Sequence, residues 1–466
     1  MDFSKARRPA LSPTNRVAEG NEAVNLSLKL RNAPLSRVCA TENQMEPISK
    51  YKRPAVPAFL LLMIPAQAVI AQDKLELDPV QVVTASRTAE DPEKAMASVS
   101  VISAADIRQS AAQDLLELLR MQAGVDIVRT GGAGGQTSVF MRGGNSNHTL
   151  VLIDGMRVAS AHTGAYAWEH LPLDQVDRIE IVRGPRAALF GSDAIGGVIQ
   201  VFTRFSEQAH LRVTTGSFST NEFEAGAGFD AGEARFSINA GYRDSDGFSS
   251  QNSNGFSYAP DDDGFEAKSI GINGQGDTEN GQWRFRIMAL ENEVEFDEGV
   301  STSDQLYASA SMNRQVRENW SWKLQAGVTD DELASDFIFF TSAFESTRSE
   351  ISWNNHVDLS RGTLQLGLDH TREDGKSEFN YDQDRDNSAL FAMWNQEGES
   401  SRFQLSGRLD DNSSFGSEFT YQAALGIPAG EDAELLGLWG TAFRAPTLSE
   451  QYSPGFGGLF AGNPTL

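Results

Sequence analysis

The amino-acid sequence predicts a β-rich protein in two parts: a small mixed α/β domain, then a long antiparallel sheet that crosses a membrane. Apolar and polar residues alternate in segment after segment from His210 onward. The connections between these segments alternate between short and long, as in bacterial membrane β-barrels. A short apolar stretch preceded by basic residues has the composition of a secretory signal peptide, which indicates export.

Composition excludes some classes of protein. The chain has 466 residues and a net charge of −25, so we expect no nucleic-acid partner. A mean hydropathy of −0.36 is typical of a soluble protein, but it also fits a membrane barrel, because only alternate residues of a barrel strand face lipid. The single cysteine, Cys39, lies in a segment expected to be absent from the mature protein, so no disulfide framework is expected.

The N-terminal 71 residues divide at Met45. Residues 1–44 are polar, mixed in charge and show little periodicity, and we interpret them as a spurious or disordered extension. Residues 45–71 have a basic start, a short apolar run broken by prolines, and a small residue, Ala71, at the expected cleavage position. This pattern predicts a signal peptide with translation starting at Met45. A disordered cytoplasmic tail is the alternative for residues 1–44.

The α/β domain is expected to begin with a strand over 99–102 and two helices. Ser103 with Asp106, and Ser110 with Gln113, have the spacing of capping boxes at helix N-termini. Leucines in the second helix indicate core packing, and Gly124 is the expected helix end.

A second group of strands follows in the same domain. The apolar run 150–153, the dipeptide Asp154-Gly155 and residues 156–158 predict a tight hairpin, because Asp-Gly tolerates positive φ angles. The β-branched runs 179–182 and 198–202 predict two more strands. Glycines between those two runs indicate places where the backbone bends or another segment approaches closely.

The alternation from His210 to Phe443 predicts about thirteen strands, each with one apolar and one polar face. Tight turns are expected at 230–233, 277–281, 317–319, 360–362 and 397–400. Longer outer loops are expected at 243–266, 296–303, 330–345 and 375–385. The alternating apolar positions include Phe236, Ile238, Ala240, Tyr242, Trp283, Phe285, Ile287, Trp322, Leu324, Leu364, Leu366 and Leu368.

The stretches RGPRAALFGSDAIGGVI (183–199) and VFMRGGNSNHTLVLIDGMRV (139–158) resemble the plug domain of TonB-dependent outer-membrane receptors, in particular their cobalamin-transporting branch. The resemblance covers roughly residues 78–466 and includes 259–265, 409–416 and 443–466. It implies a transmembrane antiparallel β-barrel over 206–466, filled by an N-terminal mixed α/β plug domain over 91–205, in the bacterial outer membrane.

Barrels of this plugged type have about 22 strands. Thirteen strands would leave two open sheet edges, which hydrocarbon does not tolerate. We therefore expect the sequence, which ends at Leu466, to be an incomplete barrel.

The resemblance implies TonB-dependent import of a large scarce ligand, most simply a cobalamin or related corrinoid. TonB would pair with an extended segment in the linker 72–90 by strand addition, in which main-chain hydrogen bonds supply the affinity. The TonB box implied in this way comprises Asp78, Pro79, Val80, Gln81, Val82, Val83 and Thr84.

Three alternatives stay open: a ferric siderophore receptor, a non-transporting fragment or surface-binding protein, and an outer-membrane enzyme. The third is disfavoured, because His210, His356 and His370 of the barrel lie in no recognisable nucleophile motif. We predict that the chain is not an enzyme and has no catalytic cofactor.

Two segments without strand or helix periodicity, 130–136 and 159–169, are implied to be outward-facing plug loops that contact the ligand. Ordinary flexible loops are the alternative. A phosphate loop is excluded for 130–136, because no Lys-Ser or Lys-Thr follows the glycines. The expected ligand-binding residues are Gly131, Gly132, Gln136, His162, Tyr166 and Trp168.

Charged residues suggest two further roles. Arg142 and Arg183 are implied to pair with barrel glutamates at the plug–barrel contact; solvated surface arginines are the alternative. Asp261, Asp263 and Asp297 match an outer-loop Ca²⁺ site, and Ca²⁺ accepts six to eight oxygen ligands in flexible loops. Ser249 stands where the family has an acidic ligand, and a solvated acidic surface is the alternative.

Overall fold

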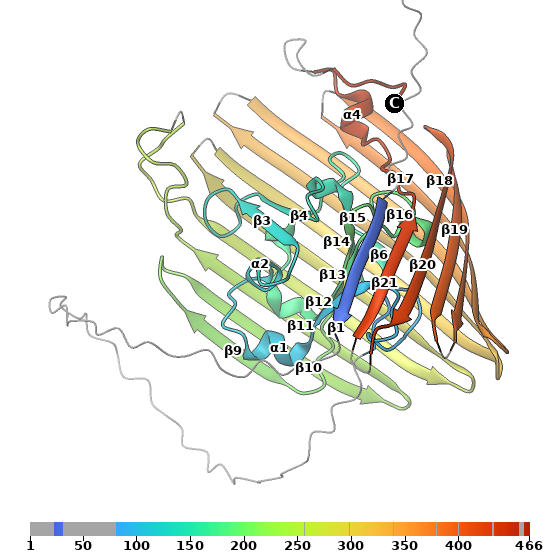
Figure 1. Ribbon diagram of the computed structural model, residues 1–466. Coiled ribbons are helices and arrows are strands. Elements are labelled where there is room, and N and C mark those ends of the chain that lie inside the picture. The colour runs from blue at the N-terminus through green and yellow to red at the C-terminus, as the bar shows by residue number, and fades with distance from the viewer. Residues whose placement is uncertain are drawn as a thin grey trace, which may run out of the picture.

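The computed structural model describes residues 23–30 and 81–466, apart from 256, 298, 339, 379, 399, 431–432 and 456–460. The signal peptide predicted over 45–71 and the first part of the predicted linker lie outside the described residues. The described chain forms a small α/β domain enclosed by a large curved sheet (Figure 1).

A five-stranded mixed sheet organises the plug, in the order β2-β7-β8-β5-β6. Only the β5–β8 pair is parallel. Asp154 and Gly155 both have positive φ, which confirms the tight hairpin between β5 and β6. The plug strands are β2 (Ser98–Ile102), β3 (Val125–Arg129), β4 (Thr137–Met141), β5 (Thr149–Ile153), β6 (Met156–Arg157), β7 (Val176–Arg183) and β8 (Gly197–Thr203), with β3 and β4 forming a separate pair.

Short helices connect these strands. Ser103 and Asp106 form the expected capping box at the start of α1. The second predicted cap is wrong, because Asp114, not Ser110, caps α2 by accepting the Glu117 N–H, while Ser110 ends α1. The helices are α1 (Ala104–Gln109), α2 (Leu115–Arg120), α3 (Ala187–Phe190) and the 3₁₀ turns η1 (Ser146–His148), η2 (Trp168–His170) and η3 (Leu173–Gln175).

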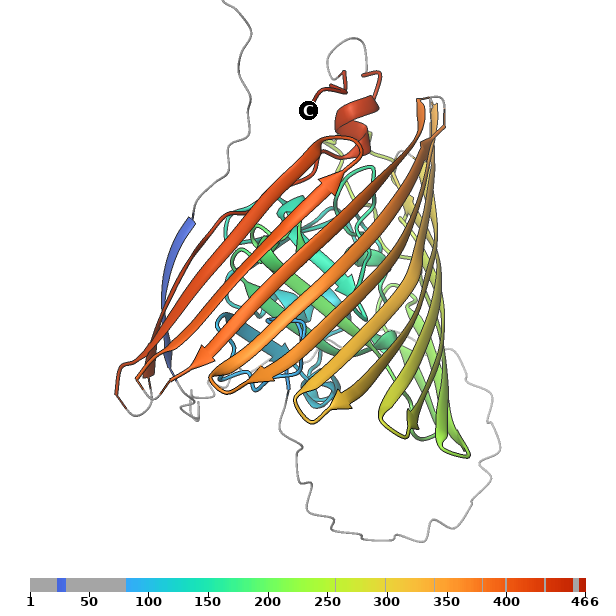
Figure 2. The same ribbon diagram turned by 90° about the vertical axis from the view of Figure 1, so that its right-hand side faces the viewer.

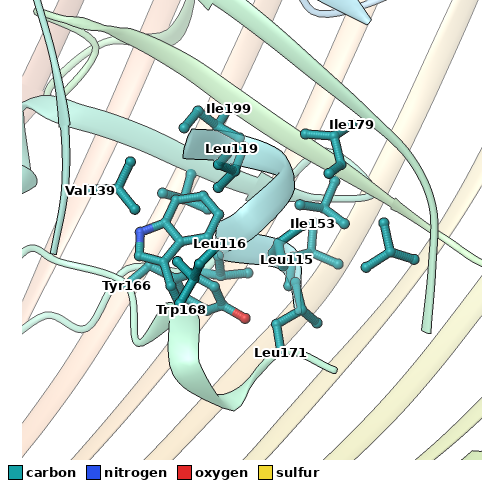
Figure 3. Packing of buried hydrophobic residues seen from close by; sticks show 14 of the residues in the cluster. Leu115, Leu116, Leu119, Val139, Ile153, Tyr166, Trp168, Leu171, Ile179 and Ile199 are labelled. Carbon is teal, nitrogen blue, oxygen red and sulfur yellow. The ribbon is translucent and has the colours of Figure 1, made fainter. Parts of the chain in front are cut away.

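The plug core lies between α2 and the five-stranded sheet (Figure 3). The leucines Leu115, Leu116 and Leu119 of α2 are at most 2% exposed and pack in one cluster with Ile179 and Ile199. The predicted core role of the α2 leucines is therefore confirmed.

Thirteen consecutive antiparallel strands follow the plug, which confirms the strand count expected from alternation. They are β9 (His210–Thr215), β10 (Asn221–Ala231), β11 (Ala234–Ser245), β12 (Phe265–Thr278), β13 (Gly281–Phe296), β14 (Gly299–Arg317), β15 (Trp320–Phe337), β16 (Phe340–Leu359), β17 (Gly362–Ser377), β18 (Tyr381–Glu397), β19 (Arg402–Asn412), β20 (Gly416–Pro428) and β21 (Ala433–Gly440).

The sheet buries its polar face and exposes its apolar face. On β19, Arg408 and Asp410 are 3% and 1% exposed, whereas Leu405 and Leu409 are 46% and 47% exposed. This arrangement is the reverse of a water-soluble sheet and is that of a strand between lipid and a polar interior. None of the helices in the described part of the chain has the length and apolar composition needed to cross a bilayer.

The tight turns lie where they were expected, but most of the predicted outer loops are wrong. Residues 330–345 and 375–385 belong mostly to the strands β15 to β18, and a short turn joins the strands in each of the two ranges. Polar residues there pair across the ladder, as in Asp330 with Thr347 and Asp336 with Thr341. Among the connections of β9 to β21 in the described part of the chain, only the β11–β12 connection, 246–264, is long. We call the end of the sheet that carries it the outer end.

Two elements lie outside the thirteen-strand series. Strand β1 (Ala23–Leu30), in the segment expected to be a spurious extension, pairs with β21 at one edge of the sheet (Figure 2). Helix α4 (Leu448–Tyr452) follows β21 at the outer end. Among the described residues, the edge strands β1 and β9 are not paired with each other, so the sheet is open.

Candidate functional site

The described part of the predicted TonB box lies folded against the plug. Val82 forms an isolated antiparallel bridge with Glu90, and a turn begins at Thr84. Val82 and Thr84 are fully buried, while Gln81 is exposed. Asp78, Pro79 and Val80 lie outside the described residues. Within the described part of the box, the turn at Thr84 ends the extended conformation.

Arg87, three residues after the box, ties this segment to the sheet. Its guanidinium donates to both carboxylate oxygens of Asp369 on β17, at 3.1 and 3.0 Å. Asp369 also accepts a hydrogen bond from Arg408 on β19. The Arg87 guanidinium lies 4.7 and 4.5 Å from the ring centroids of Phe190 and Phe391, one from the plug and one from the sheet. Sequence analysis missed these residues.

A polar cavity separates this side of the plug from strands β15 to β19. Its lining extends from Val83 and Arg87 to Phe443 and Thr447, just before α4. It encloses about 1360 Å³ of empty space, part of which is open to solvent. The charged residues of its lining are Arg87, Arg157, Asp193, Lys323, Arg348, Glu350, Asp369, Glu373, Arg385, Arg408 and Asp410.

Paired charges fill the outer part of this cavity. Glu373 accepts hydrogen bonds from Arg348, with the Nε–Oε1 distance 2.8 Å, and from Arg385. Arg385 also donates to the Pro446 carbonyl at 2.5 Å, next to α4. All three occupy inward positions of their strands and line the cavity. Their neighbours along the strands are polar or charged, for example Thr347, Arg372 and Asp384, so alternation with apolar residues gave no local signal for them.

The predicted ligand loop 130–136 lies against the long outer loop. Gln136 and Gly131 are exposed. Gly131 has a φ of +78°, and a Cβ there would lie 2.8 Å from the Ser250 Oγ. A Cβ on Gly132 would lie 3.3 Å from the Phe248 ring. The structure thus brings this plug loop and the loop of the predicted calcium ligands side by side.

The other predicted ligand residues are buried. Tyr166 and Trp168 are 4% and 3% exposed and form an edge-to-face pair, with ring centroids 5.2 Å apart, in the plug core (Figure 3). Burying a large aromatic ring contributes much favourable free energy. These rings are therefore buried although their segment shows no strand or helix periodicity. The structure places both rings in the core rather than on an outward surface.

His162 is buried in a joint between the plug, the sheet and α4. Its ring nitrogens lie 2.6 Å from the Tyr381 hydroxyl and 2.7 Å from the Glu345 carbonyl oxygen. The Tyr381 hydroxyl lies 2.9 Å from that of Ser449 on α4. Burial lowers the pKa of His162. His162 therefore connects the three parts of the molecule at the outer end.

The two plug arginines proposed for the plug–barrel contact make no ion pair within the described chain. Arg183 donates to the Ala123 carbonyl at 2.6 Å and to the Ser100 hydroxyl at 2.8 Å, both within the plug. Arg142 has a φ of +53° and is exposed. Their pairing with barrel glutamates stays a prediction.

The predicted calcium ligands lie around the long outer loop without forming one cluster. Asp263 is buried, and its Oδ2 accepts from the Ser250 N–H and hydroxyl. Asp297 Oδ1 accepts from the Ala259 N–H at 2.9 Å and the Ser249 hydroxyl at 3.4 Å. Asp261 is exposed. Within the described residues, no group of three or more His, Cys, Asp or Glu side chains is placed to hold a metal ion.

Three titratable groups of the plug, the buried His170 and the half-buried Glu169 and Asp174, line a second cavity that faces β10 to β12. Burial raises the pKa of Glu169 to about 7 and that of Asp174 to about 6. Burial lowers the pKa of His170 to about 4. The plug therefore carries groups that change charge near neutral and mildly acidic pH.

Comparisons with known proteins agree with this architecture. A family model described as the TonB-dependent receptor plug domain matches residues 91–198, and one described as the TonB-dependent receptor-like β-barrel matches 193–466. The vitamin B12 transporter BtuB of Vibrio vulnificus (strain YJ016) is 31% identical over 431 residues, covering 88% of this chain and 68% of that protein. BtuB of Vibrio cholerae (strain M66-2) is 32% identical over 425 residues, covering 86% and 68%.

Solved structures share the fold. A mutant of the ferric enterobactin receptor PfeA from Pseudomonas aeruginosa has a TM-score of 0.65 at 18% identity, covering 83% of this chain and 68% of that one. The siderophore receptor PirA from Acinetobacter baumannii has a TM-score of 0.64 at 17% identity, covering 76% and 62%. The chain thus spans about two thirds of the length of these proteins.

A mixed α/β plug inside an antiparallel sheet with a polar inner face and an apolar outer face defines a plugged outer-membrane barrel. The chain belongs to the TonB-dependent receptor family, whose members are located in the bacterial outer membrane and are not enzymes.

Proposed function

We propose that this chain serves TonB-dependent active import of a large scarce ligand across the bacterial outer membrane, and that the ligand is a cobalamin or a related corrinoid. The observation that carries this proposal is the identity of 31–32% with two vitamin B12 transporters over 86–88% of the chain. The exposed apolar face of β9 to β21 would contact outer-membrane lipid.

The import would need two events at opposite ends of the plug. The ligand binds at the outer end, and TonB binds the segment 78–84 by strand addition. No covalent chemistry is required. The folded position of Val82 to Thr84 in the present structure supports a resting state in which this segment is not presented to TonB.

For the ligand contact we retain Gly131, Gly132 and Gln136. Their loop lies at the plug surface next to Phe248 and Ser250 of the long outer loop, so both loops can contribute to one binding surface. The buried positions of His162, Tyr166 and Trp168 support roles in the joint and the core instead.

We keep calcium binding at the long outer loop as a proposal with a partial fit. Asp297 Oδ2 is buried and has no hydrogen-bond partner, so it offers a free oxygen beside Ser249. Asp261 and Asp263 would have to turn toward it. Calcium titration by calorimetry tests this: we expect heat of binding that is lost in an Asp261→Ala/Asp263→Ala variant, and equal heats would contradict it.

Uptake of radiolabelled cobalamin tests the main proposal. Cells that carry the complete gene should accumulate label only when TonB is present. A ferric siderophore is the second candidate ligand, supported by the fold shared with PfeA and PirA, so labelled ferric enterobactin is measured in parallel. A third candidate is a non-transporting surface-binding protein, supported by the open sheet; it predicts binding without uptake of either ligand.

A further inference from the structure

Glu180 is a charged residue at the centre of the plug sheet. It lies on β7, between Val101 of β2 and Gln200 of β8 in the register, and it is 0% exposed. Its neighbours along the strand, Ile179 and Ile181, face the apolar core and are also fully buried. Burying a carboxylate costs free energy unless hydrogen-bond donors surround it, so the donors around Glu180 indicate its role.

The donors come from the predicted TonB box, almost one hundred residues earlier in the chain. Glu180 Oε2 accepts from the Val83 N–H at 2.9 Å, the Thr84 N–H at 2.8 Å and the Thr84 hydroxyl at 2.6 Å. The Thr84 hydroxyl also lies 3.0 Å from Gln200 Oε1. An ionised carboxylate is an acceptor only, which suits this group of donors.

The remaining charge is balanced on the other side. Arg178 lies 2.9 Å from Glu180 Oε1, and its guanidinium stacks 4.1 Å from the centroid of the Phe202 ring. Val182, on the same face of β7, packs against Val82 and Ala85. One face of β7 therefore binds the segment 82–85. The Glu180 carboxylate accepts hydrogen bonds from its main chain, and Val182 makes apolar contact with its side chains.

These contacts occupy the groups that strand addition needs. Strand addition depends on free main-chain donors and acceptors. The Val82 N–H donates to the Glu90 carbonyl at 2.8 Å, and the next two N–H groups donate to Glu180. Three consecutive donors of the predicted box are thus engaged within the plug.

We propose that Glu180 is an internal competitor for TonB: it holds the main-chain donors of Val83 and Thr84, so the box cannot add to a partner strand until these bonds break. The inference rests on the proposed function, in which TonB binds this segment. Glu180 is a positioning residue, because it acts through the conformation of the box.

Thiol labelling measures release of the box in the full chain. In a Cys39→Ser background, V82C places a thiol at a fully buried position that a maleimide reaches only when the segment detaches. Loss of a charge-assisted hydrogen bond should raise the detached population, and hence the labelling rate, roughly 10- to 100-fold in Glu180→Gln. Thr84→Val, which leaves Glu180 intact, should raise it by a smaller factor.

Matched controls separate release from general destabilisation. V139C reports a 1% exposed position in the plug core, and its labelling rate should not change with Glu180→Gln. Ser86→Ala removes a hydroxyl whose hydrogen bonds within the described residues are to Thr88, and it should leave the V82C rate unchanged. Unchanged V82C labelling in both Glu180→Gln and Thr84→Val, or equal acceleration at V82C and V139C, overturns the inference.

Binding of the purified periplasmic domain of TonB separates this inference from the proposed function. If the box is released in Glu180→Gln, TonB should bind without ligand. Faster V82C labelling with no gain in TonB binding leaves Glu180 as the anchor of the segment and contradicts TonB binding at this segment.

Discussion

The plug and the surrounding sheet bury opposite kinds of side chain. The plug buries Leu119 and Ile179 and carries most of its charges outside, as a water-soluble domain does. The sheet buries Gln404 and Arg408 and exposes Leu405. The difference shows that the two regions face different surroundings: the plug fills a polar interior, and the sheet separates that interior from lipid.

The two regions meet through both apolar and charged side chains. Arg87 from the N-terminal segment, Asp369 from β17 and Arg408 from β19 form one largely buried ion-pair group. Such groups are costly to break from one side, because the partner charges stay buried. The plug–sheet contact should therefore be the most sensitive part of the molecule to single substitutions.

Asp369→Asn should have the largest effect. Among the described residues, it leaves Arg87 without a carboxylate partner, while Arg408 keeps Asp410, and it should cost about 3–5 kcal/mol, measured as the free energy of unfolding in urea. Asp374→Asn, on the same strand but in an exposed pair with Arg372, should cost about 1 kcal/mol or less. Equal costs for the two variants would contradict a buried plug–sheet contact.

Leu119→Ala tests the plug core. Removing a fully buried leucine should cost about 2–5 kcal/mol and increase hydrogen exchange throughout the plug sheet. Met121→Ala, at a position that is 67% exposed, should stay within about 0.5 kcal/mol. A similar response at both positions would mean that the plug has no packed core around α2.

Leu405→Arg tests the outer face of the sheet. A lipid-facing arginine costs up to about 2–4 kcal/mol at the bilayer midplane and less toward its surfaces, so Leu405→Arg should destabilise the sheet and reduce the fraction of folded protein recovered from outer membranes. Leu405→Met keeps the site apolar and serves as the control. If arginine is tolerated as well as methionine, Leu405 faces water.

Glu169→Gln should have the smallest effect, and one that depends on pH. Burial raises the pKa of Glu169 to about 7, from about 4.3 in an unfolded chain. Its contribution to stability is therefore full below about pH 4.3 and is lost as the pH rises through about 7. The melting temperature of Glu169→Gln relative to the unsubstituted protein should rise between pH 5 and pH 8, and a pH-independent difference would contradict this.

Local patterns predicted much of the fold. Alternation gave thirteen strands, since the period of two follows directly from strand geometry. It was not applied to the eight residues of β1, whose sequence AVNLSLKL also alternates. The outer loops were predicted too long, because polar residues such as Asp336 and Thr341 were assigned to a loop although they pair across strands.

Less of the candidate site than of the fold could be predicted from the sequence. Tyr166 and Trp168 lie in a segment without periodicity, and only the folded chain shows that neighbouring elements cover them. The contacts of Glu180 and Asp369 join residues far apart in sequence, and no local pattern predicts which donors a buried carboxylate meets. The TonB box and Ca²⁺ assignments came from family resemblance and stay predictions.

The central claim is that the sheet has a lipid-facing side and a polar side turned toward the plug. A spin-label scan along β19 from Phe403 to Asp410, in membranes, measures collisions with oxygen and with a water-soluble nickel reagent. We predict strict alternation, with high oxygen and low nickel accessibility at positions 403, 405, 407 and 409, and low values for both reagents at the positions between. Comparable nickel accessibility on both faces would contradict a membrane-spanning sheet around a plug.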